Sequence, residues 1–484
     1  MKKLAYKNMI KVVALTMVVT LGSCKKEFLE VVPKGKLLAQ KVSEYNLLLS
    51  NLPLINIGAS NSQVLMGDEV AAFEPYFSAA VLKTQRTFKW EDILYQPEED
   101  AGEIVVPMTN IYLYNKVINE VPDAIEGTEQ DKLRIEAEAR AGRAWTYFQL
   151  INYFGKPYNE NTSATDLGYP IVTEADVAET KFTRASVKEV YEFILQDLNA
   201  AIPNLPAQIS HRTRMSKSAA EGILGKVLVF MGRYNEAIPH FDAAISGLQN
   251  ATVPVRIYDY KVELATGGAF TPIGTNGPAT PTIVNQAESV YAKQFSANWM
   301  GSSNEIVISP QTVALFSSTD LRLRWYTPTA RSGPAYPANV LKKNGSTQTP
   351  FGVLVPDLYL LRAEAKVRNN DFSGAKADVE ALRINRFPAN DPAIAVPANI
   401  VGQKMPLLNF ILNERIREFA VMGYRWFDMR RLSVDPLFMQ NTYTHTIFSA
   451  TGTVAETITL RPERLVMRFP QKLIDQNPGM PNNP

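Results

Sequence analysis

Apolar residues recur at helical spacing through most of the chain. A repeat of one apolar residue every three or four positions predicts helices at about residues 39–50, 108–120, 131–154 and 187–202. Ser186 is the expected N-cap of the last helix, because its hydroxyl can accept a backbone N–H from the first turn. Residues 131–154 begin amphipathic and then become apolar on all sides, which predicts a helix buried most deeply near its end.

The clearest internal repeat lies at residues 216–245. Gly225, Gly232 and Phe241 fall at positions typical of tetratricopeptide helix pairs, where small residues let two antiparallel helices approach closely. A weaker copy occupies residues 359–386. One helix pair cannot bury its own apolar face, so the pairs are expected to stack into a superhelical scaffold. The predicted fold is therefore mostly α-helical.

Residues 409–432 combine large apolar side chains with closely spaced acids and arginines. We expect a helical hairpin here, with Gly423 ending the first helix and Arg425 opening the second. Because buried charges must be paired, these acids and arginines are expected to form an internal ion-pair network. Arginines within one helical turn would keep Glu414 and Glu418 ionised, which disfavours either residue as a general acid.

Residues 1–23 have the pattern of a bacterial signal peptide. Lysines precede a short apolar run, and residues 21–24, LGSC, fit a lipobox. Cys24 is the single cysteine in the chain and the expected site of lipid attachment, where acyl chains such as palmitate would anchor the mature protein. The alternative is an ordinary secretory signal in which this cysteine occurs by chance. With Cys24 modified, no disulfide can form, so the core alone must stabilise the fold.

Charge and motif content argue against several functional classes. Removing the four lysines of the signal peptide lowers the formal net charge from +2 to −2, which gives no reason to expect nucleic acid as a partner. The three histidines lack the spacing of metal ligands, and the chain has no glycine-rich phosphate loop. We therefore expect no catalytic residues, no metal site and no cofactor.

Residues 251–352 break the helical pattern but keep many aromatic residues, so we expect them to fold back over the scaffold. Flat rings can stack on the C–H faces of sugars while amides and charged groups bind the hydroxyls. The alternative for each ring is a place in the core, which we expect for Trp90. The candidate ligand-binding residues are Trp299 with Asn298, Trp325 with Tyr326 and, from residues 58–96, Tyr76 with Phe77.

Several separated segments resemble the SusD/RagB family of outer-membrane nutrient-binding lipoproteins. They include residues 28–35, 137–158, 413–432 and 467–484. The family is mostly α-helical, with tetratricopeptide-like pairs on one side and an irregular ligand-binding side that carries short strands. The resemblance implies one domain at 24–484, with a helical scaffold at 31–250 and 353–484 and a loop-rich binding subregion at 251–352.

The resemblance also implies a non-enzymatic protein anchored by lipid to the outer membrane of Bacteroidota-like bacteria and facing the exterior. Family members capture glycans, and some capture peptides, for a SusC-like TonB-dependent transporter. We therefore expect an oligosaccharide-binding protein with that transporter as its partner. The alternatives are a peptide-capturing member, a scaffold that holds a protein on its concave helical face, and a glycoside hydrolase, which would need two carboxylates about 5 to 10 Å apart across a cleft.

Overall fold

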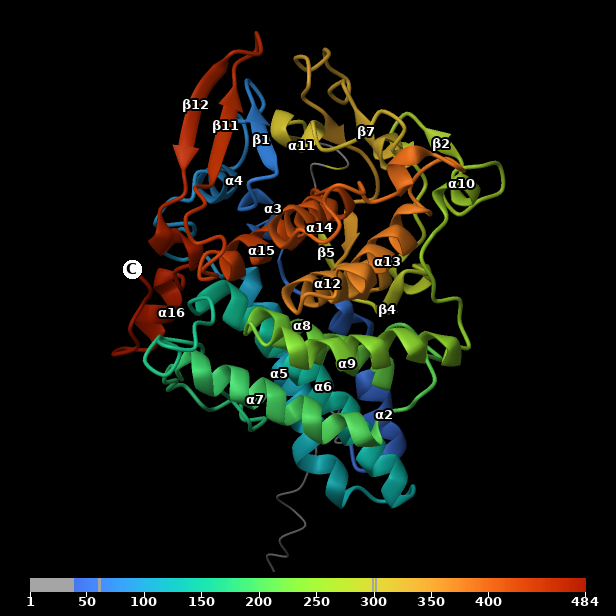
Figure 1. Ribbon diagram of the computed structural model, residues 1–484. Helices are drawn as coiled ribbons and strands as arrows, with labels where there is room; N and C mark the ends of the chain where they lie inside the picture. Colours follow the sequence, from blue (N-terminus) through green and yellow to red (C-terminus); the bar gives the residue numbers. More distant parts are fainter. Residues whose placement is uncertain (1–38, 60–61, 298–299, 301–302) are drawn as a thin grey trace, which may run out of the picture.

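The computed structural model describes residues 39–59, 62–297, 300 and 303–484. Helices are its main regular secondary structure, and most of the labelled strands lie in the upper half of the view (Figure 1). The predicted mostly α-helical fold is confirmed. The main helices are α2 (Val42–Leu49), α5 (Gly102–Glu120), α6 (Glu129–Phe154), α7 (Val187–Ala201), α8 (Lys217–Phe230), α9 (Tyr234–Ser246), α12 (Val355–Arg368), α13 (Phe372–Arg383), α14 (Lys404–Phe419) and α15 (Tyr424–Leu432).

Helices lie where the apolar periodicity predicts them, with small differences at their ends. α5 begins at Gly102, before the expected residue 108, and continues through Pro107. Ser186 caps α7 as predicted, because its hydroxyl accepts the backbone N–H of Glu189 at 3.2 Å. The Glu189 carboxylate accepts the backbone N–H of Ser186 in return, which satisfies two N–H groups that the helix itself cannot bond.

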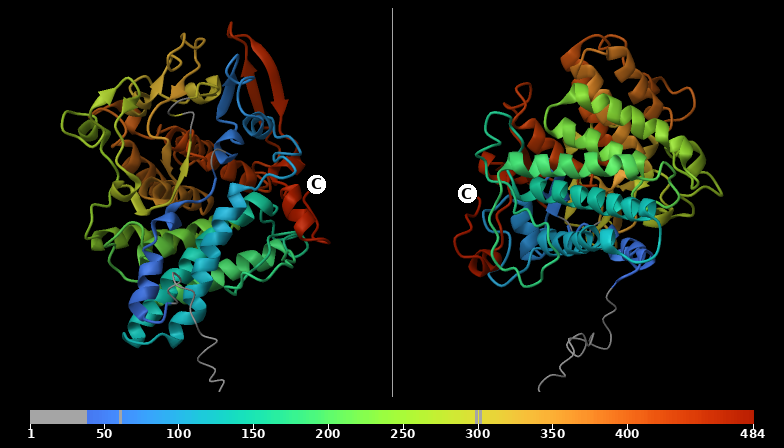
Figure 2. Two further views of the ribbon diagram at one scale, coloured as in Figure 1. Left: turned by 180° about the vertical axis from the view of Figure 1, so that it is seen from behind. Right: turned by 90° about the horizontal axis from the view of Figure 1, so that it is seen from below.

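The predicted helix pairs pack closely through their small residues. A Cβ atom at Gly225 would lie 2.9 Å from the Phe241 ring of α9, and one at Gly222 would lie 2.7 Å from Leu358 of α12. Larger residues at either place would force the helices apart. Gly232 makes the turn between α8 and α9 with φ +75°, a conformation that favours glycine. Seen from below, α5 to α9 lie side by side as a layered scaffold (Figure 2).

The helix pair predicted at residues 409–432 is present and its charges are paired, but α14 already ends at Phe419, and Gly423 is the N-cap of α15, which begins at Tyr424. Glu414 is fully buried and forms ion pairs with Arg322, Arg383 and Arg417. Burial by itself would raise the pKa of Glu414, but these three guanidinium groups outweigh it and hold the pKa well below its usual range. The expected ion-pair network is therefore confirmed, and it joins α14 to α13 and to residues of the irregular region.

A four-stranded sheet in the order β12–β11–β1–β6 covers one end of the molecule. Its strands are β1 (Val70–Phe73), β6 (Ile306–Ile308), β11 (Thr444–Phe448) and β12 (Val454–Thr459). β1 pairs in parallel with β11 and antiparallel with β6. The β11–β12 hairpin lies inside the stretch that we expected to be helical scaffold. The sequence feature that indicates this hairpin is a pair of runs rich in threonine and other β-branched residues, separated by a turn at Gly452, whose φ is +84°.

The irregular region folds back over the scaffold as predicted. Short pairs brace it: β2 (Ile273–Gly274) with β3 (Gly277–Pro278), β4 (Ser289–Tyr291) with β10 (Val353–Leu354), β5 (Gln294–Ser296) with β9 (Gln348–Pro350), and β7 (Tyr326–Thr327) with β8 (Lys342–Lys343). The shorter helices include α3 (Ser62–Leu65), α4 (Leu82–Phe88), α10 (Tyr260–Glu263), α11 (Pro310–Val313), η8 (Leu321–Trp325) and α16 (Gln471–Gln476).

The predicted signal peptide and Cys24 lie outside the described residues, so lipid attachment stays a prediction. Within the part of the chain that the structure describes, no helix has both the length and the apolar character needed to cross a bilayer.

Candidate functional site

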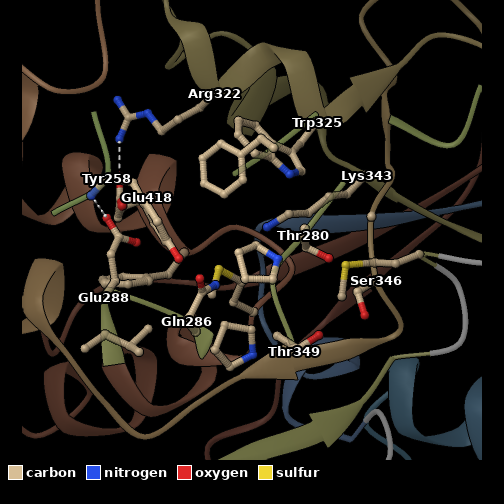
Figure 3. Close-up of a pocket in the computed structure, with 18 of the residues that line it drawn as sticks. Tyr258, Thr280, Gln286, Glu288, Arg322, Trp325, Lys343, Ser346, Thr349 and Glu418 are labelled. Carbon is tan, nitrogen blue, oxygen red and sulfur yellow. Dashed lines mark hydrogen bonds and ion pairs between the residues drawn. The ribbon is translucent and has the colours of Figure 1, made fainter. Parts of the chain in front are cut away.

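A hollow opens where the irregular region meets the turn between α14 and α15. It encloses about 1040 Å³, including the space at its open mouth. Its lining comes from residues 258–288, 322–326, 343–354 and 417–422, together with Met300. The pocket therefore lies between the ion-paired scaffold and the aromatic-rich loops, and segments far apart in the sequence combine to line it (Figure 3).

One wall of the pocket is aromatic. Tyr258, Tyr260, Phe270 and Trp325 form a cluster of their own, with Trp325 8% exposed. The Phe270 ring stands edge-on to Trp325 at 4.9 Å between centroids, and Tyr260 lies tilted against Trp325 at 4.8 Å. Edge-to-face packing of this kind is favourable for aromatic rings. The rings of this wall therefore hold one another in place.

Uncharged polar side chains line the opposite side and the rim. They are Thr280, Gln286, Asn344, Ser346, Gln348 and Thr349. Two buried atoms among them, Gln286 Oε1 and Thr349 Oγ1, have no hydrogen-bond partner within the described chain. Buried polar atoms are normally hydrogen-bonded, so a ligand in the pocket would meet an acceptor and a hydroxyl that the fold itself leaves unused.

Two carboxylates in the lining are tied to a single arginine. Nη2 of Arg386 contacts Glu288 Oε1 at 2.7 Å and Glu418 Oε1 at 2.6 Å, and Arg322 contacts Glu418 at 2.9 Å. Burial raises the pKa of Glu288, whereas Arg386 and Arg322 outweigh burial at Glu418 and lower its pKa. The guanidinium group fills the space between the carboxylates, so this pair does not flank an open cleft in the way glycoside hydrolysis requires.

Lys343 of β8 brings a different kind of charge to the pocket. Its ammonium donates a hydrogen bond to the carbonyl of Ala420 at 2.6 Å and forms no ion pair with any described residue. Burial lowers the pKa of Lys343 to about 8, against the opposing effect of nearby Glu418 and Glu69, and leaves it mostly charged at neutral pH. The turn that supplies the carbonyl is tightly constrained, because Val421 has φ +62°, which β-branched residues rarely adopt.

Trp325 and Tyr326 lie together in the lining of this pocket. Trp325 ends η8 and belongs to the aromatic wall, while Tyr326 opens β7 and packs against Phe316 at 5.7 Å between ring centroids. Arg324, between the η8 residues Arg322 and Trp325, is exposed and does not line the pocket. Their role in ligand binding stays a prediction, since no ligand contact has been observed.

The other predicted binding residues lie elsewhere. Phe77 is 2% exposed and packs against Phe88 at 5.0 Å between ring centroids, so its ring has no open face for a ligand. Tyr76 is half-buried beside Phe73 in a small cluster next to the sheet. Asn298 and Trp299 lie outside the described residues. For Phe77 the structure supports the alternative of a place in the core, which a short apolar run without a clear period could not distinguish from a surface position.

Sequence reasoning missed Lys343, Gln286 and Thr349. Nothing in their local pattern marks them, because their importance comes from what the fold places opposite them. The one available signal was composition: residues 340–350 are rich in polar side chains beside a region full of aromatic rings. That pattern is common in loops, so it could not single out these three residues.

The histidines and acids of the described residues are not grouped as metal ligands. Within the described chain, no group of three or more His, Cys, Asp or Glu side chains is placed to hold a metal ion. His240 contacts Glu221 at 2.6 Å, and the buried His445 is stacked between Phe88 and Trp90. The expected place of Trp90 in the core is confirmed, since it is 4% exposed.

Comparisons with known proteins agree with one another. Residues 29–229 match a family model described as "Starch-binding associating with outer membrane", and residues 355–484 match a model described as "SusD family". A SusD-like protein of Bacteroides ovatus is 32% identical over 130 residues, which is 26% of this chain and 21% of that protein. SusD-like protein P2 of Formosa agariphila is 23% identical over 342 residues, or 62% of this chain and 65% of that protein. Each match thus spans less than two thirds of the relative.

Solved structures extend the likeness to nearly the whole chain. A SusD superfamily protein from Bacteroides thetaiotaomicron has a TM-score of 0.69 at 17% identity, covering 92% of this chain and 100% of that one. A SusD-like carbohydrate binding protein from Bacteroides vulgatus has a TM-score of 0.63 at 15% identity, covering 91% and 98%. At these identities the likeness establishes a shared fold.

Proposed function

The chain belongs to the SusD/RagB family, and from that premise we propose that it is a binding protein that captures oligosaccharides at the outer membrane. It holds them in the pocket lined by Trp325 and passes them to a SusC-like TonB-dependent transporter. A lipid anchor at Cys24 keeps it on the exterior face of the membrane. A carbohydrate-binding role is what the family match supports, and the description of one matching model names both starch binding and the outer membrane.

The pocket itself is the observation that carries this proposal. A sugar ring has apolar C–H faces and a rim of hydroxyls, so it suits a site with aromatic rings on one side and free hydrogen-bonding groups on the other. The partly buried Tyr260, whose ring lies tilted against Trp325 in the pocket wall, meets the first need. Gln286 Oε1 and Thr349 Oγ1, both buried and without partners in the described chain, meet the second.

Affinity electrophoresis of the mature protein against a panel of polysaccharides tests the proposal. We expect retardation on at least one glycan. Gln286→Leu and Thr349→Val keep the shape of the pocket but remove its unused polar atoms, so each should weaken binding about three- to tenfold, the effect of one hydrogen bond. Thr180→Val, at an exposed site outside the pocket, is the matched control. Binding to peptides and to no glycan would favour the peptide-capturing alternative instead.

We also propose that the protein binds sugars without cleaving them. The support is the position of Glu288 and Glu418, whose carboxylates both contact Arg386. A retained glycan should therefore release no new reducing ends during long incubation with the protein. Release that Glu288→Gln abolishes would favour the hydrolase alternative.

The membrane anchor and the transporter are tested together in cells. Cys24→Ala should move the protein out of the outer-membrane fraction, because the acyl chains can no longer be attached. Purification of the native protein from detergent-solubilised outer membranes should bring a TonB-dependent transporter with it. Recovery of a different protein partner would favour the scaffold alternative.

A further inference from the structure

We propose that the pocket takes an acidic oligosaccharide, whose negatively charged group pairs with Lys343; the inference rests on the glycan-binding function proposed above. The charged group is a carboxylate or a sulfate ester, since a lysine ammonium accepts either one. The argument comes from the balance of charge around the pocket.

Five charged side chains line the pocket: Glu288, Arg322, Lys343, Arg417 and Glu418. Four of these belong to the buried network of the scaffold. Arg322 and Arg417 both contact Glu414, and Arg386 holds Glu288 and Glu418. Lys343 is the exception within the described chain, because its ammonium has a carbonyl as its partner and no carboxylate.

The network is balanced without Lys343. Its acids are Asp320, Glu288, Glu414 and Glu418, and its arginines are Arg322, Arg383, Arg386 and Arg417. Each acid is therefore matched by one guanidinium group, and none is left over to neutralise the lysine.

One further carboxyl, that of Glu69, lies near Lys343. Glu69 is 2% exposed, and its carboxyl group forms no ion pair with a described residue. Burial, together with the neighbouring Asp68, raises the pKa of Glu69 to about 8. Glu69 is thus mostly protonated at neutral pH and does not offset the charge of Lys343. The pocket keeps one positive charge that the protein has not paired.

The position of this charge suits a bound ligand. Lys343 extends into the space shared by Thr280, Gln286 and Thr349, with Trp325 beside it (Figure 3). A lysine ammonium can donate three hydrogen bonds, and Ala420 accepts one of them. A sugar stacked on the wall could therefore direct an acidic substituent toward Lys343 while its hydroxyls reach the uncharged side chains. An anion there would also restore the solvation that burial removes from the ammonium.

Binding of matched probe pairs by the mature protein tests this inference. Oligogalacturonate and its fully methyl-esterified form make the carboxylate pair, and sulfated carrageenan oligosaccharide and its desulfated form make the sulfate pair. Titration calorimetry at low salt should give at least about tenfold tighter binding for the charged member of one pair, because charge-assisted hydrogen bonds are stronger than neutral ones. The pair that shows the preference identifies the acidic group.

Two variants assign the preference to Lys343. Lys343→Met should abolish it, so that the charged and neutral members of the pair bind with similar affinity. Lys343→Arg should keep part of it, because the positive charge remains. Arg324→Met removes an exposed arginine of η8 that does not line the pocket, so it should leave the preference intact. Should Lys343→Met fail to fold, reductive methylation with mass spectrometry gives a second test: the acidic probe should protect Lys343 and its neutral counterpart should not.

The outcomes separate this inference from the proposed function. Glycan binding without preference for the charged member of either pair would overturn the inference and leave the glycan-binding function standing. A preference that survives in Lys343→Met, or equal protection of Lys343 by both probes, would also overturn it. Failure to bind any glycan, charged or neutral, would instead overturn the proposed function.

Discussion

The two sides of the pocket treat charge in opposite ways. On the α14 side, Glu414 and Glu418 are held by several arginines, and the fold depends on these contacts. On the β8 side, Lys343 contacts one carbonyl and lies beside polar atoms that have no partner in the described chain. Charges that stabilise a fold have ion-pair partners within the protein, whereas charges that bind a ligand need not have one. This contrast distinguishes structural from binding residues within a single cavity.

The strongest test of the contrast is to remove an arginine from the ion-pair network on the α14 side. Arg386→Met should lower the free energy of unfolding by about 3–5 kcal/mol, because Glu288 and Glu418 would be left buried without their shared partner. Urea denaturation followed by circular dichroism measures the change. Arg324→Met, at an exposed position, should change it by less than about 0.5 kcal/mol. A loss below about 1 kcal/mol for Arg386→Met would contradict a structural role for the network.

Low pH should weaken the ion pairs of α14 and α15. The pKa values of Glu414 and Asp428 are held well below their usual range in the folded protein, so these groups bind fewer protons folded than unfolded. Their stabilising contribution is present above pH 4.5 and is lost as the pH falls through the folded pKa values. We expect a loss of about 2–3 kcal/mol for each group in the free energy of unfolding. Glu414→Gln should be less stable at neutral pH and show a shallower dependence on acid.

High pH should remove the charge of Lys343 on the β8 side of the pocket. The folded pKa of Lys343 is about 8, so the ammonium loses its proton as the pH rises through that value. The groups that face it are Glu418 of α14, Glu69 before β1 and Tyr326 of β7. The preference for an acidic probe, about tenfold at pH 7, should therefore approach unity by about pH 10. Because a bound anion favours the charged form, the midpoint in the complex should lie above 8. Titrations of the neutral probe at the same pH values provide the control.

The smallest expected effect is on the stability of the Lys343 variant itself. Burial lowers the folded pKa of Lys343 relative to the unfolded value, so charging this group at neutral pH costs stability rather than adding to it. Lys343→Met should raise the free energy of unfolding by up to about 1 kcal/mol, a small change because Lys343 is only half-buried and solvent screens it. A clear loss of stability would instead place Lys343 with the structural charges.

The sequence predicts the ion-paired α14 side of the pocket better than the β8 side that carries Lys343. The α14–α15 hairpin and its ion pairs could be foreseen because acids, arginines and apolar residues lie within a few turns of one another. Trp325 and Tyr326 could be proposed as binding residues from their rings and the arginines beside them. The properties of Lys343, by contrast, depend on Ala420, which is far away in the sequence and lies opposite it in the fold. No local pattern contains that contact.

The contrast between local patterns and contacts that join distant residues also explains where the observed fold differs from the predicted one. The helix pairs follow from local periodicity and small residues such as Gly225. The β11–β12 hairpin was missed because its neighbours on both sides are helical or irregular, and because β12 is mostly exposed and has no apolar face to reveal it. The burial of Phe77 could not be decided from the sequence, because the contact that buries it, with Phe88, depends on how α4 packs.

The sheet at the end of the molecule has a consequence for how the protein matures. β1 pairs on one edge with β6 and on the other with β11, which lies close to the C-terminus. A strand with a free edge is a template for wrong pairing with other chains. During synthesis from the N-terminus, that edge of β1 stays open until Ile447 and Phe448 have emerged, long after the first helix pairs are complete. Chains cut short before Thr444 should therefore aggregate through β1 even though most of their helices can form.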